Sequence, residues 1–287
     1  MTISDRSVPG RYHLRRVVRR VARAHRRREE VSRSLPPLVH GVLAAVSSSD
    51  MSRDERRWAG QIEERRARLL GSTRVVRYRD FGAGLPDRIP SGEETLAGRA
   101  GSQSLGRLTK VASKDRHWAG FLMRLVRETR PVRCVEMGAA VGISAAYQAA
   151  ALTINGDGGR LTTLEGGEPL AAVTRETLDG LGLSGVADVV QGRFADTLTG
   201  VLADGAPDYV FVDGHHDGRA TVDYFGQIAA VMGRGVVVLD DIDWSASMRR
   251  AWQEVRDHED VTLSVDLRRM GVCVLGEPGW RLRVDAA

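Results

Sequence analysis

Acidic and imidazole side chains gather at the ends of two short apolar runs in the second half of the chain. The first run ends at Asp213, with His215 and His216 just beyond it, and the second ends at Asp240 and Asp241. Each of these residues has an ordinary structural alternative, as a helix cap or as a hydrogen-bonded surface histidine. Because ligands of open α/β sheets bind beyond the carboxyl ends of the strands, the gathering of these groups points to chemistry.

A glycine turn precedes these runs in the chain. An apolar segment leads to Glu136, Gly138 and Gly142 follow four residues apart, and a helical segment begins near Ser144. Glycine lets the backbone approach a ligand closely, and the free N–H groups at a helix start favour a polar or anionic ligand. A dinucleotide site prefers the spacing G-x-G-x-x-G, so the spacing found here disfavours a nicotinamide cofactor.

Two more predicted strands follow the glycine turn. The strand at 161–165 ends in Glu165, roughly 20 residues beyond the glycines, where a carboxylate can accept hydrogen bonds from both ribose hydroxyls. The strand at 188–192 is followed by Arg193 and Phe194.

The elements that must position these residues alternate regularly between strand and helix patterns. This alternation predicts an α/β fold with a doubly wound, mostly parallel sheet. A helix is expected at 113–130, just before the first strand, and another at 245–258. Two closing strands are expected at 261–267 and 271–275.

The 287 residues are 42% hydrophobic, which is enough for one catalytic domain with an extension. We expect a basic helical N-terminal extension at 1–72 and the catalytic domain at 73–287. Arginine-rich helices are predicted at 11–30 and 53–70, whereas residues 1–50 show no core-forming pattern, so a chain beginning at Met51 is expected to fold.

The stretch from Arg74 to Gly106 is expected to be irregular, either as a lid or as a disordered segment. Cys134 and Cys273 each lie in an apolar run, as reduced core residues of a cytosolic protein do. No apolar run is long enough for a membrane span, and the basic and apolar segments near the N-terminus lack the order of an export signal. We therefore expect a cytoplasmic protein.

Three motifs resemble those of class I S-adenosylmethionine-dependent methyltransferases. They are Glu136-x-Gly138-x-x-x-Gly142-x-Ser144, Val212-Asp213-Gly214-His215-His216 and Leu239-Asp240-Asp241-Ile242. The chain from about Tyr78 to Val284 is similar to the bacterial group that contains catechol-type and macrolide-sugar O-methyltransferases. This resemblance implies a Rossmann-like sheet of seven strands in the order 3-2-1-4-5-7-6, with the seventh strand antiparallel, and S-adenosylmethionine as the cofactor.

The resemblance also implies roles for single residues. Asp213, Asp240 and Asp241 match the positions that hold a magnesium-like ion in metal-dependent relatives, so Mg²⁺ is an expected cofactor. His216 matches a catalytic base, and Asp213 would act beside it. The cofactor contacts implied are Glu136, Gly138, Gly142, Ser144, Glu165, Arg193, Phe194 and Asp213.

The function expected is methyl transfer from S-adenosylmethionine to a hydroxyl of a small molecule, with a natural product among the acceptors considered. The alternatives are a methyltransferase acting on RNA or protein, supported only by the basic N-terminal segment, a nicotinamide-dependent oxidoreductase and a catalytically silent binding module. We expect a small-molecule acceptor as partner, neither nucleic acid nor a membrane, and a homodimer stays an open alternative.

Overall fold

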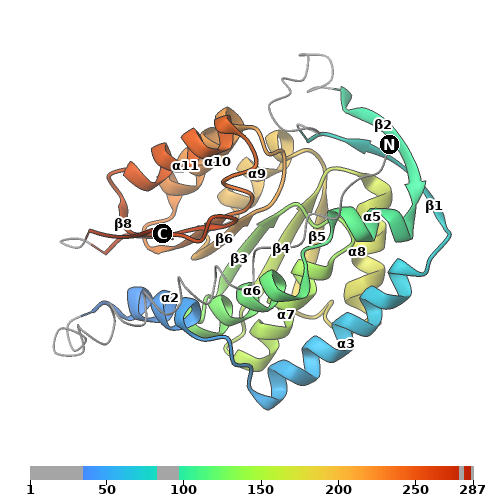
Figure 1. Cartoon of the computed structure of the whole chain (residues 1–287), viewed down its shortest axis with the longest axis horizontal. Helices are drawn as coiled ribbons and strands as arrows, with labels where there is room; N and C mark the ends of the chain where they lie inside the picture. Colours follow the sequence, from blue (N-terminus) through green and yellow to red (C-terminus); the bar gives the residue numbers. More distant parts are fainter. Residues whose placement is uncertain (1–34, 83–96, 278–280, 286–287) are drawn as a thin grey trace.

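The computed structural model describes residues 35–82, 97–277 and 281–285, so the basic helix expected at 11–30 lies outside the described residues. Within them, the core is an eight-stranded sheet in the order β10-β8-β9-β7-β6-β3-β4-β5 (Figure 1). Its strands are β3 (Arg133–Met137), β4 (Arg160–Glu165), β5 (Ala187–Gln191), β6 (Tyr209–Val212), β7 (Gly235–Leu239), β8 (Val261–Asp266), β9 (Gly271–Leu275) and β10 (Leu282–Asp285).

The strand directions confirm the expected topology and add one strand to it. Strands β3 to β7 pair in parallel, and β9 runs antiparallel to both β7 and β8. Without β10 the order is the expected 3-2-1-4-5-7-6. The additional strand pairs parallel with β8 at the sheet edge, where Leu282 and Val284 pack against the core and Arg283 is exposed. Four residues of alternating polarity are too short a pattern to distinguish from a loop.

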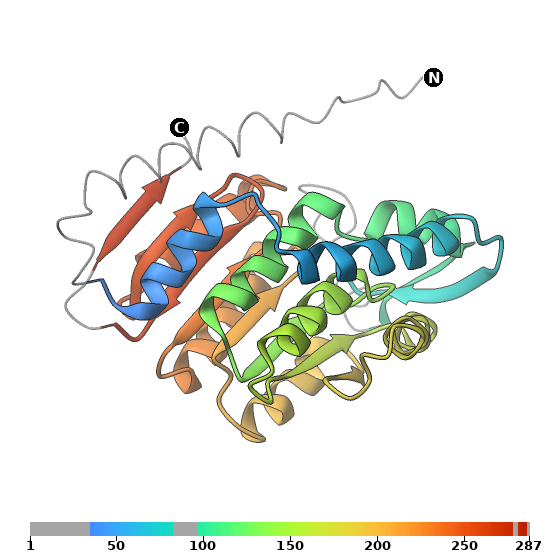
Figure 2. The ribbon, with the colours of Figure 1, turned by 90° about the horizontal axis from the view of Figure 1, so that it is seen from below.

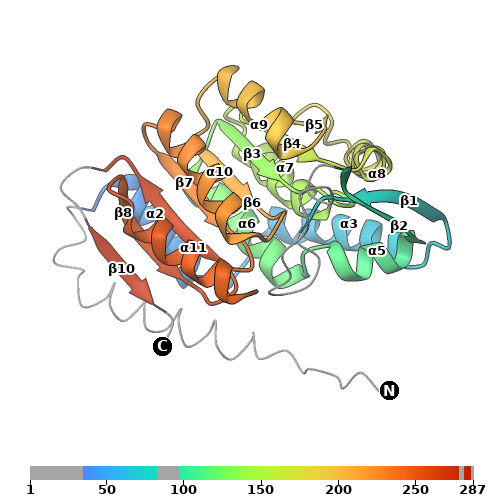
Figure 3. The ribbon, with the colours of Figure 1, turned by 90° about the horizontal axis from the view of Figure 1, so that it is seen from above.

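Helices cover both faces of the sheet because its strands bury both faces. In β6, Tyr209 and Phe211 join one hydrophobic cluster, whereas Val210 and Val212 join the other. One face carries α2, α6, α7 and α8, with α3 and α5 packed on that layer, and the opposite face carries α9, α10 and α11 (Figures 2 and 3). The helices are α2 (Pro37–Ser47), α3 (Arg53–Leu70), α5 (Leu105–Ala112), α6 (Arg116–Thr129), α7 (Ile143–Asn155), α8 (Glu168–Gly180), α9 (Phe194–Ala203), α10 (Gly218–Val231) and α11 (Ala246–Asp257).

The segment before Met51 contributes to the core, contrary to the prediction from the sequence. Val39, Val42 and Val46 of α2 are at most 1% exposed and belong to the cluster that α6 and α7 share. The apolar run is short, but it forms one helix that packs along α6 and reaches β9. The boundary between residues 72 and 73 stays a prediction, although α2 and α3 share the core of the catalytic domain.

The expectation of an irregular stretch at 74–106 is wrong at both of its ends. Strand β1 (Val75–Asp80) pairs antiparallel with β2 (Arg99–Ser104), and residues 83–96 between them lie outside the described residues. Of these two strands only Val76 is buried, and β2 has no large apolar residue, so the alternation that reveals a strand is nearly absent. In the part of the chain described, no helix is both long and apolar enough to cross a membrane.

Candidate functional site

The turn between β3 and α7 needs glycine because two other elements pass close to it. Gly138 has φ 109°, and a Cβ built there would lie 2.1 Å from the carbonyl oxygen of Asp213. Gly142 has φ 81°, and its Cβ would lie 3.1 Å from Cα of Thr174 in α8. The two glycines thus bring β6 and α8 against the turn, whereas the sequence suggested a close approach to a ligand. No side chain caps α7, so the N–H groups of its first turn suit a polar ligand.

Glu165 links the end of β4 to this turn. Its carboxylate accepts hydrogen bonds from the backbone N–H of Ala140 at 2.8 Å and of Gly167 at 2.9 Å. Burial raises the pKa of Glu165, and the backbone hydrogen bonds act in the opposite direction. Each carboxylate oxygen accepts one backbone hydrogen bond and has lone pairs left, so the group can still accept hydrogen bonds from a ribose diol.

Glu136 and Ser144 lie beneath the turn. The Glu136 side chain is fully buried and accepts hydrogen bonds from Thr163 Oγ1 at 2.6 Å and Gln148 Nε2 at 2.8 Å. Burial raises the pKa of Glu136 to about 7, while the hydrogen bonds from Thr163, Ser144 and Gln148 limit the rise. These two predicted cofactor contacts therefore support the turn from inside the protein.

Arg193 and Phe194 lie at the start of α9, beyond the end of β5. Arg193 forms an ion pair with Asp196, with Nε 2.6 Å from Oδ2. Phe194 meets Tyr224 edge to face, with ring centroids 6.0 Å apart, and lies so close to Gly214 that a Cβ there would be 2.7 Å from the ring. Both predicted residues thus lie at the strand ends, and Phe194 lies next to the turn that follows β6.

A groove of about 700 Å³ lies beside Glu165. One wall is the segment from Gly166 to Pro169 after β4, and the other comes from β1 and β2, with Arg77, Arg79 and Phe81 among its residues. The ring of Phe81 lies against Gly166, where a Cβ would be 2.8 Å from the ring. Strands β1 and β2, which the sequence did not reveal, therefore form part of the wall of the groove beside Glu165.

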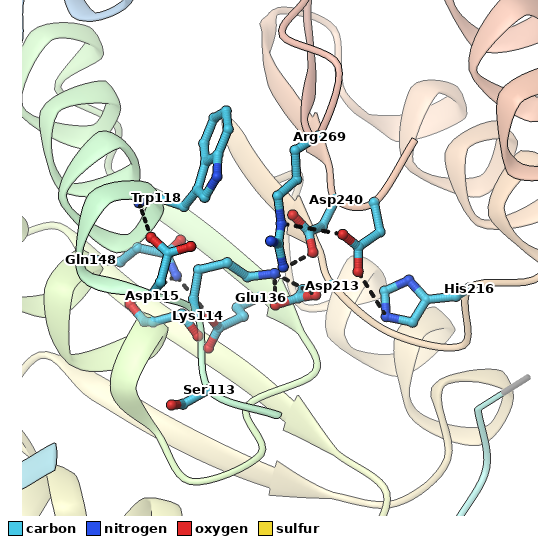
Figure 4. A network of polar contacts seen from close by, with 12 residues as sticks. Ser113, Lys114, Asp115, Trp118, Glu136, Gln148, Asp213, His216, Asp240 and Arg269 are labelled. Atoms are coloured by element: carbon cyan, nitrogen blue, oxygen red, sulfur yellow. Dashed lines mark hydrogen bonds and ion pairs between the residues drawn. The ribbon is translucent and has the colours of Figure 1, made fainter. Parts of the chain in front are cut away.

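A lysine occupies the centre of the predicted metal site (Figure 4). The Nζ atom of Lys114 lies 3.0 Å from Asp213 Oδ2 and forms a hydrogen bond and an ion pair with Asp240 Oδ2. The side chains of Lys114 and Asp240 are 5% and 0% exposed. Burial alone would lower the pKa of Lys114, but Asp213, Asp240 and Asp241 outweigh burial and raise it, so the amine is charged.

The two aspartates beside Lys114 differ from each other. Burial, followed by the charge of Asp240, raises the pKa of Asp213 well above its ordinary value. Burial also works against ionisation of Asp240, but Lys114 and the hydrogen bonds from Asp213 and Lys114 outweigh it and lower the pKa of Asp240. Asp240 is therefore the ionised partner of the lysine at neutral pH.

Local structure on both sides holds the backbone of Lys114. It stands in the short connection between α5 and α6, where Ser113 is the C-cap of the first helix and Asp115 the N-cap of the second. The Asp115 carboxylate accepts hydrogen bonds from the N–H groups of His117 and Trp118 at 2.9 and 3.1 Å. The sequence analysis missed Lys114, although only two of the 42 basic residues are lysines.

Asp241 belongs to a second group of charges next to the first. Its Oδ1 lies 3.3 Å from Nε of Arg269, and its Oδ2 lies 3.9 Å from Nε2 of His216. Arg269 precedes β9, and its carbonyl accepts a hydrogen bond from the N–H of Ile242, which fixes the two loops together. The His216 ring also lies against Trp244, with centroids 5.9 Å apart.

Backbone strain accompanies these strand ends. His215, His216 and Asp241 have φ values of 68°, 45° and 51°, a left-handed region that residues other than glycine adopt uncommonly, although aspartate and histidine enter it more often than most. Such conformations cost on the order of 1–3 kcal/mol and concentrate at functional sites. His215 forms a hydrogen bond with the hydroxyl of Tyr224 at 3.0 Å, so of the two histidines His216 is the one beside Asp241.

The prediction of a metal site at Asp213, Asp240 and Asp241 is corrected by this arrangement. Among the described residues no group of histidines, cysteines and acids is arranged to hold a metal ion. Lys114 pairs with the first two aspartates, and the third turns to Arg269. Like unit charges 4 Å apart repel by about 4 kcal/mol at an effective dielectric constant of 20, so a divalent ion beside the ammonium would meet about 8 kcal/mol of repulsion. The residues present do not fit a metal.

Comparison with known proteins finds a family that part of the chain resembles. The family model described as "Methyltransferase domain" matches residues 135–242. This part of the chain is similar to a methyltransferase domain. Every site residue predicted from the sequence lies inside the matched span, whereas Lys114 and Arg269 lie outside it. No curated protein matches the chain.

Solved structures show the same fold for the methyltransferase domain. An O-methyltransferase from Bacillus cereus with bound S-adenosylhomocysteine has a TM-score of 0.50 and 20% identity, over 57% of this chain and 83% of that one. A methyltransferase from Podospora anserina, also with S-adenosylhomocysteine, has a TM-score of 0.51 and 16% identity, over 58% and 81% of the chains. A methyltransferase from Geobacter sulfurreducens has a TM-score of 0.50 and 15% identity, over 60% and 86%.

Proposed function

We propose that the protein transfers a methyl group from S-adenosylmethionine to a hydroxyl of a small-molecule acceptor. The observation that carries the proposal is the carboxylate of Glu165, which is bound to the backbone of the turn at Ala140 and keeps lone pairs for a ribose diol. The O-methyltransferase from Bacillus cereus with S-adenosylhomocysteine bound supports oxygen as the atom that accepts the methyl group.

The turn after β3 lies next to the end of β6, because Gly138 touches the backbone of Asp213. The nucleoside would lie between Glu165 and the groove, and the uncapped start of α7 would receive the polar end of the cofactor. The methyl carbon would then face the ends of β6 and β7. When bound, S-adenosylmethionine supplies a methyl carbon on a positively charged sulfur.

His216 would act as the general base in this site. The carboxylate of Asp241 lies 3.9 Å from the Nε2 atom of His216, and a general base contributes roughly 10²- to 10⁴-fold to a rate. His216 accepts the hydroxyl proton as the acceptor oxygen forms its bond to carbon and the carbon–sulfur bond breaks. The proton then leaves to solvent. Holding oxygen and carbon about 3 Å apart and in line supplies much of the remaining acceleration.

The experiment begins with calorimetry on the purified full chain, using S-adenosylmethionine and NADH. We expect the first to bind and the second not to bind. Turnover is then followed as S-adenosylhomocysteine release over a panel of hydroxylated small molecules. His216→Ala should lower kcat by about 10²-fold or more with unchanged cofactor affinity. His215→Ala is the matched control and should cost less. Binding of NADH without S-adenosylmethionine would reject the proposal.

A further inference from the structure

The positive charge in the transfer site comes from the chain itself. We propose that the ammonium group of Lys114 is a built-in replacement for the divalent cation that Asp213 and Asp240 would otherwise bind, and that methyl transfer here proceeds without a metal ion. This inference rests on the proposed function, because it assigns the cation of that same site.

The contacts show that Lys114 occupies the position of such an ion. Its Nζ atom lies 3.0 and 3.1 Å from the two carboxylate oxygens of Asp213 and is hydrogen bonded to Asp240. A divalent cation that bridged the ends of β6 and β7 would need the same oxygens, since Mg²⁺ and Ca²⁺ bind carboxylates. The ammonium and the ion therefore compete for one place (Figure 4).

Two cations already face the carboxylates of this site without a metal. Three carboxylates, Asp213, Asp240 and Asp241, face Lys114 and Arg269, and His216 approaches Asp241 from the other side. A divalent ion could enter only by displacing the ammonium. Because helix caps on both sides hold the backbone of Lys114 and its side chain is 5% exposed, displacement would move a buried charged group away from the carboxylates that pair with it.

The residue type fits this role. In this arginine-rich chain only Lys110 and Lys114 are lysines. An ammonium is a compact point charge that fits between two carboxylates, whereas a planar guanidinium spreads its charge over a larger fork. Lys114 is thus a positioning residue: it holds Asp213 and Asp240 together, as a metal would, and Asp213 is the partner with the more exposed side chain.

The test measures the binding of Mn²⁺ to chelator-treated full-length protein by electron paramagnetic resonance. It compares the wild type with two variants in which a lysine is replaced by methionine. We expect no saturable binding at this site in the wild type. Lys114→Met has similar length but no charge, and it should bind one Mn²⁺ at least about tenfold more tightly, because the repulsion is gone and the carboxylates remain. Lys110→Met, the same change at an exposed lysine one helical turn earlier, should behave as the wild type does.

Two outcomes would overturn the proposal. The first is a folded Lys114→Met protein with no gain in Mn²⁺ affinity, which a purely structural lysine would produce. The second is saturable Mn²⁺ binding by the wild type that Asp240→Asn abolishes. The second outcome does not depend on Lys114→Met, so it can overturn the proposal even if that variant fails to fold.

An activity measurement separates this inference from the proposed function. Wild-type turnover should be unchanged by chelator, and Mn²⁺ should restore part of the activity lost in Lys114→Met. If the wild type fails to bind S-adenosylmethionine, the proposed function fails, whereas the Mn²⁺ comparison still reports on Lys114. If turnover is found but chelator abolishes it, the proposed function stands and the Lys114 proposal falls.

Discussion

The turn after β3 and the charge cluster beyond β6 and β7 touch each other but are built in different ways. Backbone groups hold the turn, as in the hydrogen bond from Ala140 to Glu165, which are 25 residues apart. Side-chain charges hold the cluster, and Lys114 and Asp240 are 126 residues apart. The turn should therefore be sensitive to backbone conformation, and the cluster to charge and to the helices that support it.

The largest effect should come from removing the helix that supports the cluster. A chain beginning at Met51 lacks α2, which packs along α6, the helix that begins just after Lys114. Fully burying one valine is worth roughly 1.5–3 kcal/mol, so loss of Val39, Val42 and Val46 should lower the free energy of unfolding by about 4 kcal/mol or more. Urea unfolding of this chain and of a chain beginning at Leu35 measures the difference in the free energy of unfolding. Equal midpoints would restore the original prediction that residues before Met51 are dispensable.

The next effect tests the backbone of the turn. Gly138→Ala places a Cβ against the Asp213 carbonyl at φ 109°, and we expect a loss of about 3 kcal/mol or more in unfolding free energy. Gly156→Ala is the control, because φ is 69° there but nothing lies within 4 Å of the added carbon. It should cost only about 1–2 kcal/mol. Equal losses would show that the contact with β6 does not matter.

A third prediction concerns the buried acid beneath the turn. Burial raises the pKa of Glu136 from 4.5 to about 7, so the folded protein holds this proton more tightly than the unfolded chain does. The resulting stability is present below pH 4.5 and is lost as pH rises through about 7. The loss is about 3 kcal/mol, at 1.36 kcal/mol per pKa unit.

Glu136→Gln removes this titration, so the free energy of unfolding should change less between pH 5 and pH 8 in the variant than in the wild type. Urea unfolding at several pH values measures the difference. Thr163→Val serves as a companion variant, since it removes a hydrogen bond that lowers the pKa of Glu136 and should steepen the decline. Parallel pH profiles for wild type and Glu136→Gln would contradict the prediction.

The smallest effect is on cofactor affinity at the turn. Glu165→Gln keeps the shape but loses the charged acceptor, and binding of S-adenosylmethionine should weaken by about 1 kcal/mol or more in calorimetry. Asp188→Asn, an exposed acid on the neighbouring β5, should leave affinity unchanged. If both variants bind as the wild type does, Glu165 serves only to hold the turn.

The sequence predicted the turn well because its parts are close together along the chain. The apolar run to Glu136, the two glycines and the acid at the end of β4 each leave a local pattern, and the structure places them where those patterns indicate. The structure adds a second reason for glycine at position 138, the nearby carbonyl of Asp213, and no pattern within the turn reveals a neighbour 75 residues away.

The sequence by itself determined the alternation of strands and helices and the set of acids at the strand ends, because strand and helix periods are local consequences of burial. The order of the strands in the sheet was expected only from the resemblance to a known family. The tertiary structure alone decided what those acids bind. The resemblance implied that the three aspartates at these strand ends bind a metal. In the folded protein they instead form ion pairs with Lys114 and Arg269, which lie outside the matched span. A charge acts through space, so its partner is fixed only when the chain has folded.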